Sequence, residues 1–293
     1  HDTAMARSKR WMTGTLLLAG AALCFALPRP AAPAEPVTLL LTSNLEGRFI
    51  PDIDGQETRD PMLLLGQSIV MEARRTKALY FDLGNSFYPG VLSKHNYGGA
   101  MMDFFSRFQC RSTLISSMDL RVGISSLEFL QGRGATALLS ANILRDRSPL
   151  FRPYIIQELQ GRRVAFVGLS SKKILIDIAE KNVYRISIED ELKALGGIVA
   201  ELEKQSVTDI ILLSGLGYRD NVKILNTFPG VRLVLSGGDH RGVLTGGSVV
   251  RLDLADRRSI ITVPPDMGYC LLKLSLDGGI TVSDVQFKKP AHH

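Results

Sequence analysis

Five segments of this sequence share one pattern, in which a short apolar run ends in small and polar residues. The clearest is KALYFDLGN at 77–85, where the apolar run leads into Asp82, Gly84 and Asn85. The other four are TSNLEG (42–47), SSMDLRVG (116–123), LSGLG (213–217) and SGGDHRG (236–242). Such apolar runs predict buried strands, and open α/β sheets bind ligands at the carboxyl ends of their strands. If these strands end at one edge, their five loops form a site.

The side chains in these loops are mostly oxygen donors. Three are carboxylates and two are amides, namely Glu46, Asp119, Asp239, Asn44 and Asn85. Oxygen donors of this kind could hold one hard cation, Ca²⁺ or Mg²⁺, without any histidine. The loops therefore allow a mononuclear cation site.

Two arginines support different readings of the same loops. Arg121 or Arg241 could neutralise the carboxylates and form a salt-bridged pocket, which is the reading we favour over a cation site. In a third reading, these arginines and the amides of the Gly-rich loops hold phosphate or a nucleotide without cleaving it. A lone acid or base at His240 is also conceivable, but no nucleophile accompanies it.

The N-terminal residues have the features of a secretory signal. After Met5 come basic residues at 7, 9 and 10, the apolar run Leu16–Leu27, and the cleavage pattern Ala32-Pro33-Ala34. We expect cleavage there and an exported protein, periplasmic or extracellular, with an uncleaved N-terminal anchor as the alternative. His1–Ala4 and the final two histidines look like added residues.

Composition predicts one globular domain at residues 35–293, after a signal within residues 1–34. Of the 293 residues, 45% are hydrophobic and 22% charged, which is ordinary for a globular protein. Residues 1–34 carry four basic residues and one acidic residue, so the domain keeps about half of the net charge of +6. No basic block interleaved with aromatics remains, which disfavours a nucleic-acid partner. The spacing of Cys110 and Cys270 leaves open whether they form a disulfide.

Apolar periodicity predicts a mixed α/β domain with too many strands for one doubly wound sheet. Two sheets packed face to face, with helices outside, suit the pattern better. Strands are expected at 37–42, 79–81, 112–116, 135–140, 152–159, 162–169, 209–214, 231–235, 249–254, 260–263, 269–276 and 280–287. Helices are expected at 62–75, 100–108, 123–131, 188–204 and 221–228, the fourth with Ser187 as its N-cap. Residues 86–99 read as a loop.

Taken in order, the loops resemble the N-terminal metallophosphatase (calcineurin-like phosphoesterase) domain of the 5′-nucleotidase family. The family motifs T-N-D-L-H-G, L-D-x-G-D, G-N-H-E/D, L-S-H-L-G and G-G-H-S-H are similar to TSNLEG, FDLGN, SSMD, LSGLG and GGDHR here. The segments LLSANILRD (138–146) and PYIIQELQGRRVAFVGLSS (153–171) also resemble family segments. The resemblance covers residues 37–287 and implies a four-layer α/β/β/α sandwich as a single domain. It also implies that this chain has no C-terminal nucleotidase domain.

In that family two divalent metals are held by carboxylates, imidazoles and one asparagine. The metals activate a bridging water and clamp the phosphoryl group. The matching ligand positions of this chain are degenerate: Asn44, Glu46, Asn85, Ser117, Gly215, Asp239 and Arg241. The histidine that assists the leaving group is matched by Met118, and the acid that orients it by Arg121. The resemblance gives Asp82 a structural role, in which it accepts loop N–H groups.

Few histidines remain from which to build such a centre. Outside the terminal residues the chain has only His95, which reads as a surface residue, and His240. Arg241 adds a fixed positive charge that opposes cation binding. We therefore expect no catalytic residue, with Met118, Arg121 and His240 as relict positions, and no cofactor beyond a single Mg²⁺ or Ca²⁺.

The sequence thus predicts an exported non-enzyme that acts as a binding or assembly module. Some similar exported sequences are associated with multihaem cytochromes, which implies a protein partner in an exported electron-transfer complex. The alternative is a metal-dependent phosphoric-ester hydrolase, acting on nucleotides, whose rebuilt site uses Glu46, Asp119 and Asp239. The partner and the oligomeric state are not specified by the sequence.

Overall fold

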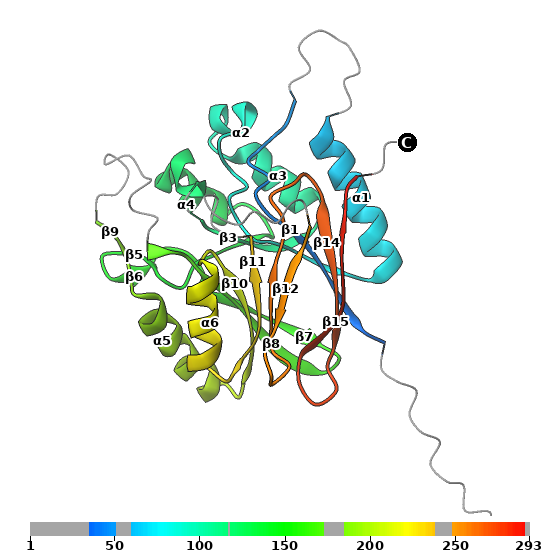
Figure 1. The fold of residues 1–293 in the computed structure, drawn as a ribbon. Coiled ribbons are helices and arrows are strands. Elements are labelled where there is room, and N and C mark those ends of the chain that lie inside the picture. Colours follow the sequence, from blue (N-terminus) through cyan, green and yellow to red (C-terminus); the bar gives the residue numbers. More distant parts are fainter. Residues whose placement is uncertain (1–34, 51–59, 117, 173–184, 238–247, 291–293) are drawn as a thin grey trace, which may run out of the picture. The chain divides into compact units, whose positions relative to one another are not determined.

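The computed structural model describes residues 35–50, 60–116, 118–172, 185–237 and 248–290. Residues from Pro36 onward belong to one compact unit (Figure 1). The predicted signal segment and the candidate residues Ser117, Asp239, His240 and Arg241 lie outside the described residues. In the part that is described, no helix has the length and apolar character needed to cross a membrane.

Two six-stranded sheets form the centre of this unit. The first has the order β15-β14-β1-β2-β3-β4, with bounds Thr281–Lys288, Tyr269–Ser275, Val37–Thr42, Leu79–Asp82, Cys110–Leu114 and Ala137–Leu139. The second has the order β12-β13-β11-β10-β8-β7, with bounds Val250–Asp253, Ser259–Thr262, Val231–Ser236, Asp209–Ser214, Arg162–Leu169 and Tyr154–Leu159. Strands β1, β2, β3, β10 and β11 lead into the five loops. In the first sheet β2 is parallel to both β1 and β3, and in the second sheet β10 is parallel to β11. Their carboxyl ends therefore lie at one edge of each sheet.

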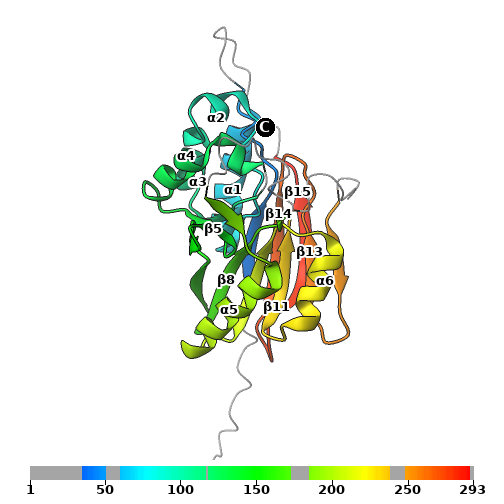
Figure 2. The ribbon, with the colours of Figure 1, turned by 90° about the vertical axis from the view of Figure 1, so that its left-hand side faces the viewer.

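Helices cover the outer face of each sheet. The first sheet is covered by α1 (Pro61–Thr76), α2 (Val91–His95), α3 (Gly99–Arg107), the short 3-10 helix η1 (Asp119–Val122) and α4 (Ile124–Gln131). The second is covered by α5 (Glu191–Lys204) and α6 (Tyr218–Thr227), which lie beside each other in Figures 1 and 2. Together these layers make the predicted four-layer α/β/β/α sandwich.

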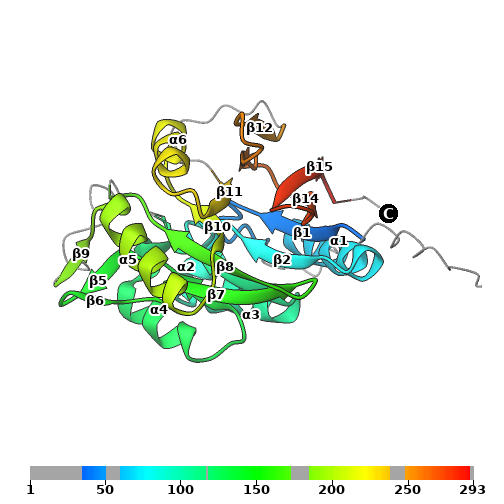
Figure 3. The ribbon, with the colours of Figure 1, turned by 90° about the horizontal axis from the view of Figure 1, so that it is seen from below.

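The inner faces of the two sheets pack on one another. Phe81 of β2 stacks on Phe166 of β8, with ring centroids 4.2 Å apart and planes 8° from parallel. Leu39 and Leu41 of β1 point into this inter-sheet core, and Leu40 points to the helices instead. Figure 3 shows β1 and β2 beside β8 and β10. The uninterrupted apolar run of β1 thus reflects burial of both faces of the sheet.

The prediction of a helix at 188–204 is wrong at its start. Ile186–Ile188 forms strand β9, which pairs with β5 (Ile143–Arg145) in a three-stranded sheet completed by β6 (Ser148–Pro149). Helix α5 begins at Glu191, and its N-cap is Asp190 instead of Ser187. The Asp190 carboxylate accepts hydrogen bonds from two amides of the first turn at 3.1 and 3.2 Å. A carboxylate caps this helix with two bonds, whereas Ser187 is engaged in strand pairing.

The segment expected to be a loop at 86–99 contains the five-residue helix α2. A single helical turn is too short to show an apolar period of 3.6 residues, so the pattern could not reveal it.

Cys110 and Cys270 do not form a disulfide in this fold. Cys110 belongs to the core between the first sheet and its helices, and Cys270 to the core between the two sheets. Their strands, β3 and β14, are separated by β1 and β2, which places them about 14 Å apart at the usual strand spacing. A disulfide requires Cα atoms within about 7 Å. Both thiols are free and buried.

Candidate functional site

The structure brings the predicted loops together. The loops after β1 and β2 are joined by backbone hydrogen bonds, from Asn44 N to Gly84 O at 2.8 Å and from Glu46 N to Asn85 O at 3.1 Å. The Asn44 side chain reaches the loop after β11, donating to Gly237 O at 2.9 Å. These loops therefore meet at the carboxyl ends of the parallel strands, as their sequences predict.

Asp82 ends β2 and ties it to both neighbouring strands. Its carboxylate accepts hydrogen bonds from Thr42 on β1 at 2.7 Å and from Thr113 on β3 at 2.6 Å. It also accepts from the Ser86 hydroxyl at 2.9 Å and the Gly84 amide at 3.0 Å. Burial raises the pKa of Asp82 to about 7, although these hydrogen bonds oppose the shift. Every contact of this carboxylate holds the start of the loop in place.

Asp119 is enclosed by backbone amides. Its Oδ1 accepts from Ser86 N at 2.8 Å and Phe87 N at 2.9 Å. Its Oδ2 accepts from Asn85 N at 2.9 Å and Ser116 N at 2.8 Å. A carboxylate has about four lone-pair sites, so four N–H donors leave none for a cation. The side chain is completely buried, and burial raises its pKa to about 6.

Asn44 and Asn85, which the family resemblance matches to two ligand positions, are hydrogen-bonded to each other. Asn85 Nδ2 donates to Asn44 Oδ1 at 3.2 Å, and Asn44 Nδ2 donates onward to Gly237 O at 2.9 Å. The other oxygen, Asn85 Oδ1, accepts from the Met118 amide at 3.2 Å. Both side chains are buried, and both residues have left-handed backbones with φ of 53° and 55°, a conformation that asparagine tolerates well. We call this hydrogen-bonded series from Met118 through Asn85 and Asn44 to Gly237 the amide clasp.

Glu46 has a partner that the sequence reading missed. Its Oε2 accepts from Arg48 Nη2 at 2.7 Å and from Arg48 Nε at 3.0 Å. The expected salt-bridged pocket assigned this role to Arg121 or Arg241. Arg121 lies with its guanidinium 5.8 Å from the centre of the Tyr88 ring, a cation–π contact. Arg48 stands two residues after Glu46, which is the one signal that could have identified it.

Two further candidate positions, Gly215 and His95, are also described by the structure. At Gly215 an added Cβ would lie 3.6 Å from Leu169 O and from Ser116 Oγ, so the position faces the same loops without crowding. His95, at the end of α2, is exposed, in keeping with the surface role expected for it.

The donor set of the described residues does not fit a pair of divalent metals. The amide clasp uses the oxygen atoms of Asn44 and Asn85 for hydrogen bonds, and Asp119 is saturated by amides. Across the described ranges, no group of three or more His, Cys, Asp or Glu side chains could hold a metal ion. In the described residues, the arrangement fixes the loops by hydrogen bonds.

No protein-family model matches this sequence. A probable 5′-nucleotidase of Treponema pallidum is 30% identical over 107 residues, covering 35% of this chain and 18% of the relative. The 5′-nucleotidase precursor of Thermus thermophilus superposes with a TM-score of 0.69 at 19% identity, covering 86% of this chain and 54% of that chain. The calcineurin-like phosphoesterase YfkN of Bacillus subtilis superposes with a TM-score of 0.68 at 16% identity, covering 87% and 90%.

This chain thus spans about a fifth of the Treponema relative and about half of the Thermus protein. The structural likeness covers nearly all of the folded unit, and the sequence likeness points to the same family. The chain has the fold of the N-terminal metallophosphatase domain of the 5′-nucleotidases and calcineurin-like phosphoesterases.

Proposed function

We propose that this chain is an exported protein with a metallophosphatase fold that has lost the dinuclear metal site and acts as a binding or assembly module. The observation that carries the proposal is the amide clasp. In it, the side chains at two ligand positions are neutral and hydrogen-bonded to each other.

The clasp matters because of what two-metal hydrolysis requires. The metals themselves lower the pKa of the attacking water, and a carboxylate shared between them holds both ions. A neutral amide at Asn85 supplies no such charge, and its Nδ2 donates to the oxygen of Asn44 that would otherwise face a cation. Without bound metals, the loops have no means of generating hydroxide at neutral pH.

A rebuilt site on Glu46, Asp119 and Asp239 is the alternative function, a metal-dependent phosphate-ester hydrolase. The contacts of two of these carboxylates weigh against it. Asp119 accepts four amide hydrogen bonds, and Glu46 is paired with Arg48. Opening either set would cost hydrogen bonds that a single hard cation must replace.

We expect the purified protein to show no hydrolysis of nucleotides, sugar-nucleotides or an aryl phosphate with added Mn²⁺, Co²⁺ or Zn²⁺. A 5′-nucleotidase assayed in parallel serves as the positive control, and elemental analysis of the protein should find no stoichiometric transition metal. The single changes Asn44→Asp and Asn85→Asp should not create activity, because Arg241 is still present and the histidine ligands are still absent.

Two results would contradict this proposal. Two equivalents of a transition metal per chain would show that the dinuclear site exists in spite of its residues. Metal-dependent turnover that disappears in Asp239→Asn would establish the carboxylate-based hydrolase instead.

Export is supported by the basic, apolar and A-x-A segments at the N-terminus. We expect the mature protein to begin at Glu35, and mass spectrometry of the protein recovered from its native compartment tests this. A mass that includes residues 5–34 would show an uncleaved anchor. The partner that we propose for the exported module is another protein, of the electron-transfer type that the sequence resemblance implies.

A further inference from the structure

A second feature lies at the other end of the first sheet from the loops. A cavity of about 330 Å³ opens where α1 and α3 end and where β2 and β3 begin. Its lining includes Lys77, Phe108 and Gln109. Since Lys77 precedes β2 and Asp82 ends it, the cavity and the amide clasp lie at opposite ends of the same strands.

The cavity is cationic. Arg74, Lys77, Arg107 and Arg111 line it, and no acidic residue does. Within the described residues, none of these four side chains has an ion pair or donates a hydrogen bond. Arg107 lies with its guanidinium carbon 5.8 Å from the centre of the Phe108 ring. Four positive charges on exposed side chains therefore border one small open space, without a protein counter-charge in the described part of the chain.

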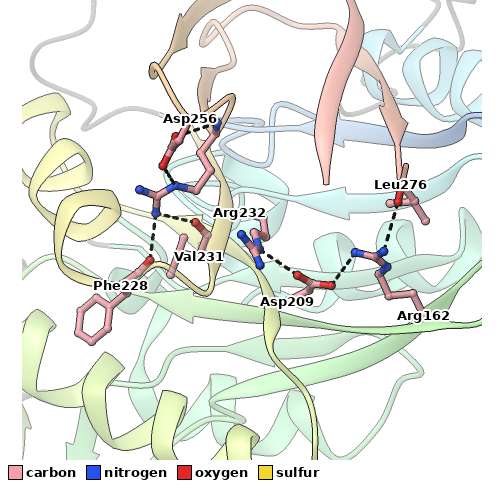
Figure 4. A network of polar contacts seen from close by, with 8 residues as sticks. Arg162, Asp209, Phe228, Val231, Arg232, Asp256 and Leu276 are labelled. Atoms are coloured by element: carbon pink, nitrogen blue, oxygen red, sulfur yellow. Dashed lines mark hydrogen bonds and ion pairs between the residues drawn. The ribbon is translucent and has the colours of Figure 1, made fainter. Parts of the chain in front are cut away.

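Other arginines of this protein show what a structural role looks like (Figure 4). Arg258 donates hydrogen bonds of 2.7 to 3.2 Å to three carbonyls at and beyond the end of α6. Arg162 and Arg232 both pair with Asp209 at 2.9 Å. Basic residues near helix C-termini often interact with the last carbonyls. The arginines of the cavity make no such bond, although Arg74 and Arg107 lie in the last turns of α1 and α3, where positive charge is favourable.

Two of the lining residues have an unusual backbone conformation. Lys77 and Gln109 follow the ends of α1 and α3, and both have left-handed backbones, with φ of 54° and 58°. Glycine is the favoured residue at such helix ends, because a Cβ is strained there. Both positions nevertheless carry long polar side chains, and both of these residues line the cavity. The same conformation occurs outside the cavity, for example at Arg257 with φ of 71°, so the case for a site depends on the charges and the cavity.

The floor of the cavity is apolar and closely packed. Phe108 packs so closely on α1 that a Cβ at Gly66 would lie 2.1 Å from its ring. Val70 and Leu79, also in the lining, are partly buried against the hydrophobic core. A ligand that suits this space therefore needs both negative charge and an apolar part.

We propose that this cavity binds a small organic phosphate, with its phosphate among the four cations and its apolar part on the Phe108 side. A phosphate monoester carries nearly two negative charges at pH 7. The volume is at the lower end of the range of small-molecule sites. The proposal is independent of whether the loops at the other end of the sheet hydrolyse anything.

Calorimetric titration of the full chain with phenyl phosphate and with inorganic phosphate, at one fixed ionic strength, tests the proposal. We expect phenyl phosphate to bind with one site per chain and more tightly than inorganic phosphate, because its ring covers the apolar wall. Lys77→Gly should weaken phenyl phosphate binding about tenfold, the loss of one charge-assisted contact. Its melting temperature should stay the same or rise, since glycine suits the left-handed position.

Arg257→Gly is the matched control. Arg257 is exposed and left-handed, with φ of 71°, but lies in the turn between β12 and β13 of the second sheet. Like Lys77→Gly, the Arg257→Gly change removes one positive charge and one left-handed side chain, but it should leave the affinity for phenyl phosphate unchanged. Arg111→Gln removes a second cavity charge from a strand instead of a helix end, and should also weaken binding about tenfold.

Three outcomes would overturn the proposal. The first is no binding of phenyl phosphate by the unmodified chain. The second is unchanged affinity in both Lys77→Gly and Arg111→Gln, which would place any binding elsewhere, for example at the clasp loops. The third is an equal loss in Arg257→Gly, which would show a general effect of net charge.

Discussion

Replacing Asp119 with alanine is expected to destabilise the protein more than any exposed substitution, by about 4 kcal/mol or more. The change leaves four buried amides, those of Asn85, Ser86, Phe87 and Ser116, without an acceptor. Each buried donor left unsatisfied costs about 1–3 kcal/mol. Since single domains are stable by only about 5–15 kcal/mol, this loss should unfold much of the protein or bring it close to unfolding.

Urea denaturation at pH 7 measures this effect. Asp103→Ala is the control, because Asp103 is exposed on α3 and should change stability by less than about 0.5 kcal/mol. A loss in Asp119→Ala that is no larger than in Asp103→Ala would mean that the amide contacts of Asp119 do not stabilise the fold.

The second large effect concerns pH. Between pH 5 and pH 8 the free energy of unfolding should fall by about 4 kcal/mol, because two buried carboxyls have raised pKa values. Burial raises the pKa of Asp82 to about 7 and that of Asp119 to about 6, from an ordinary value of 3.8. Above pH 4 the unfolded chain loses these protons while the native protein keeps them. The resulting stabilisation is therefore complete below pH 4 and is lost as the pH rises through 7.

Urea unfolding curves at pH 5, 6, 7 and 8 test this expectation. The pKa values of Glu72 and Asp253 are lowered, by hydrogen bonds to basic side chains among other contacts, so their contributions change near pH 4 and not in this window. Asp82→Asn removes the group with the larger shift and should flatten the curve between pH 6 and 8. A wild-type stability that rises across this range would contradict the assignment.

Much of the fold could be read from local pattern. The strand β1 is a continuous apolar run because both of its faces are buried, and the parallel strands around it have the same signature. The start of α5, in contrast, could not be predicted from the local sequence. Ser187 and Asp190 are both good N-caps in isolation, and the choice between them depends on the pairing of β9 with β5, more than 40 residues earlier in the chain.

In the site, too, some features could be predicted from the sequence and others depend on contacts between distant residues. The family resemblance predicts that Asn44 and Asn85 stand where metal ligands are expected, and the composition shows few histidines. It could not show what these side chains do instead. Their partners are 41 and 193 residues away, so the amide clasp depends on how distant loops meet. The same holds for Asp119, since three of its four amide donors lie in a loop more than 30 residues earlier.

The amide clasp also changes what the loops need in order to form. In a metal-dependent phosphatase, carboxylates crowd together and repel one another until cations arrive, so the final loop arrangement is coupled to the supply of ions. Here the two central side chains carry no charge, and each supplies the donor or acceptor that its neighbour requires. The hydrogen bonds of the clasp can therefore form during folding without a cation to offset charge between these two side chains.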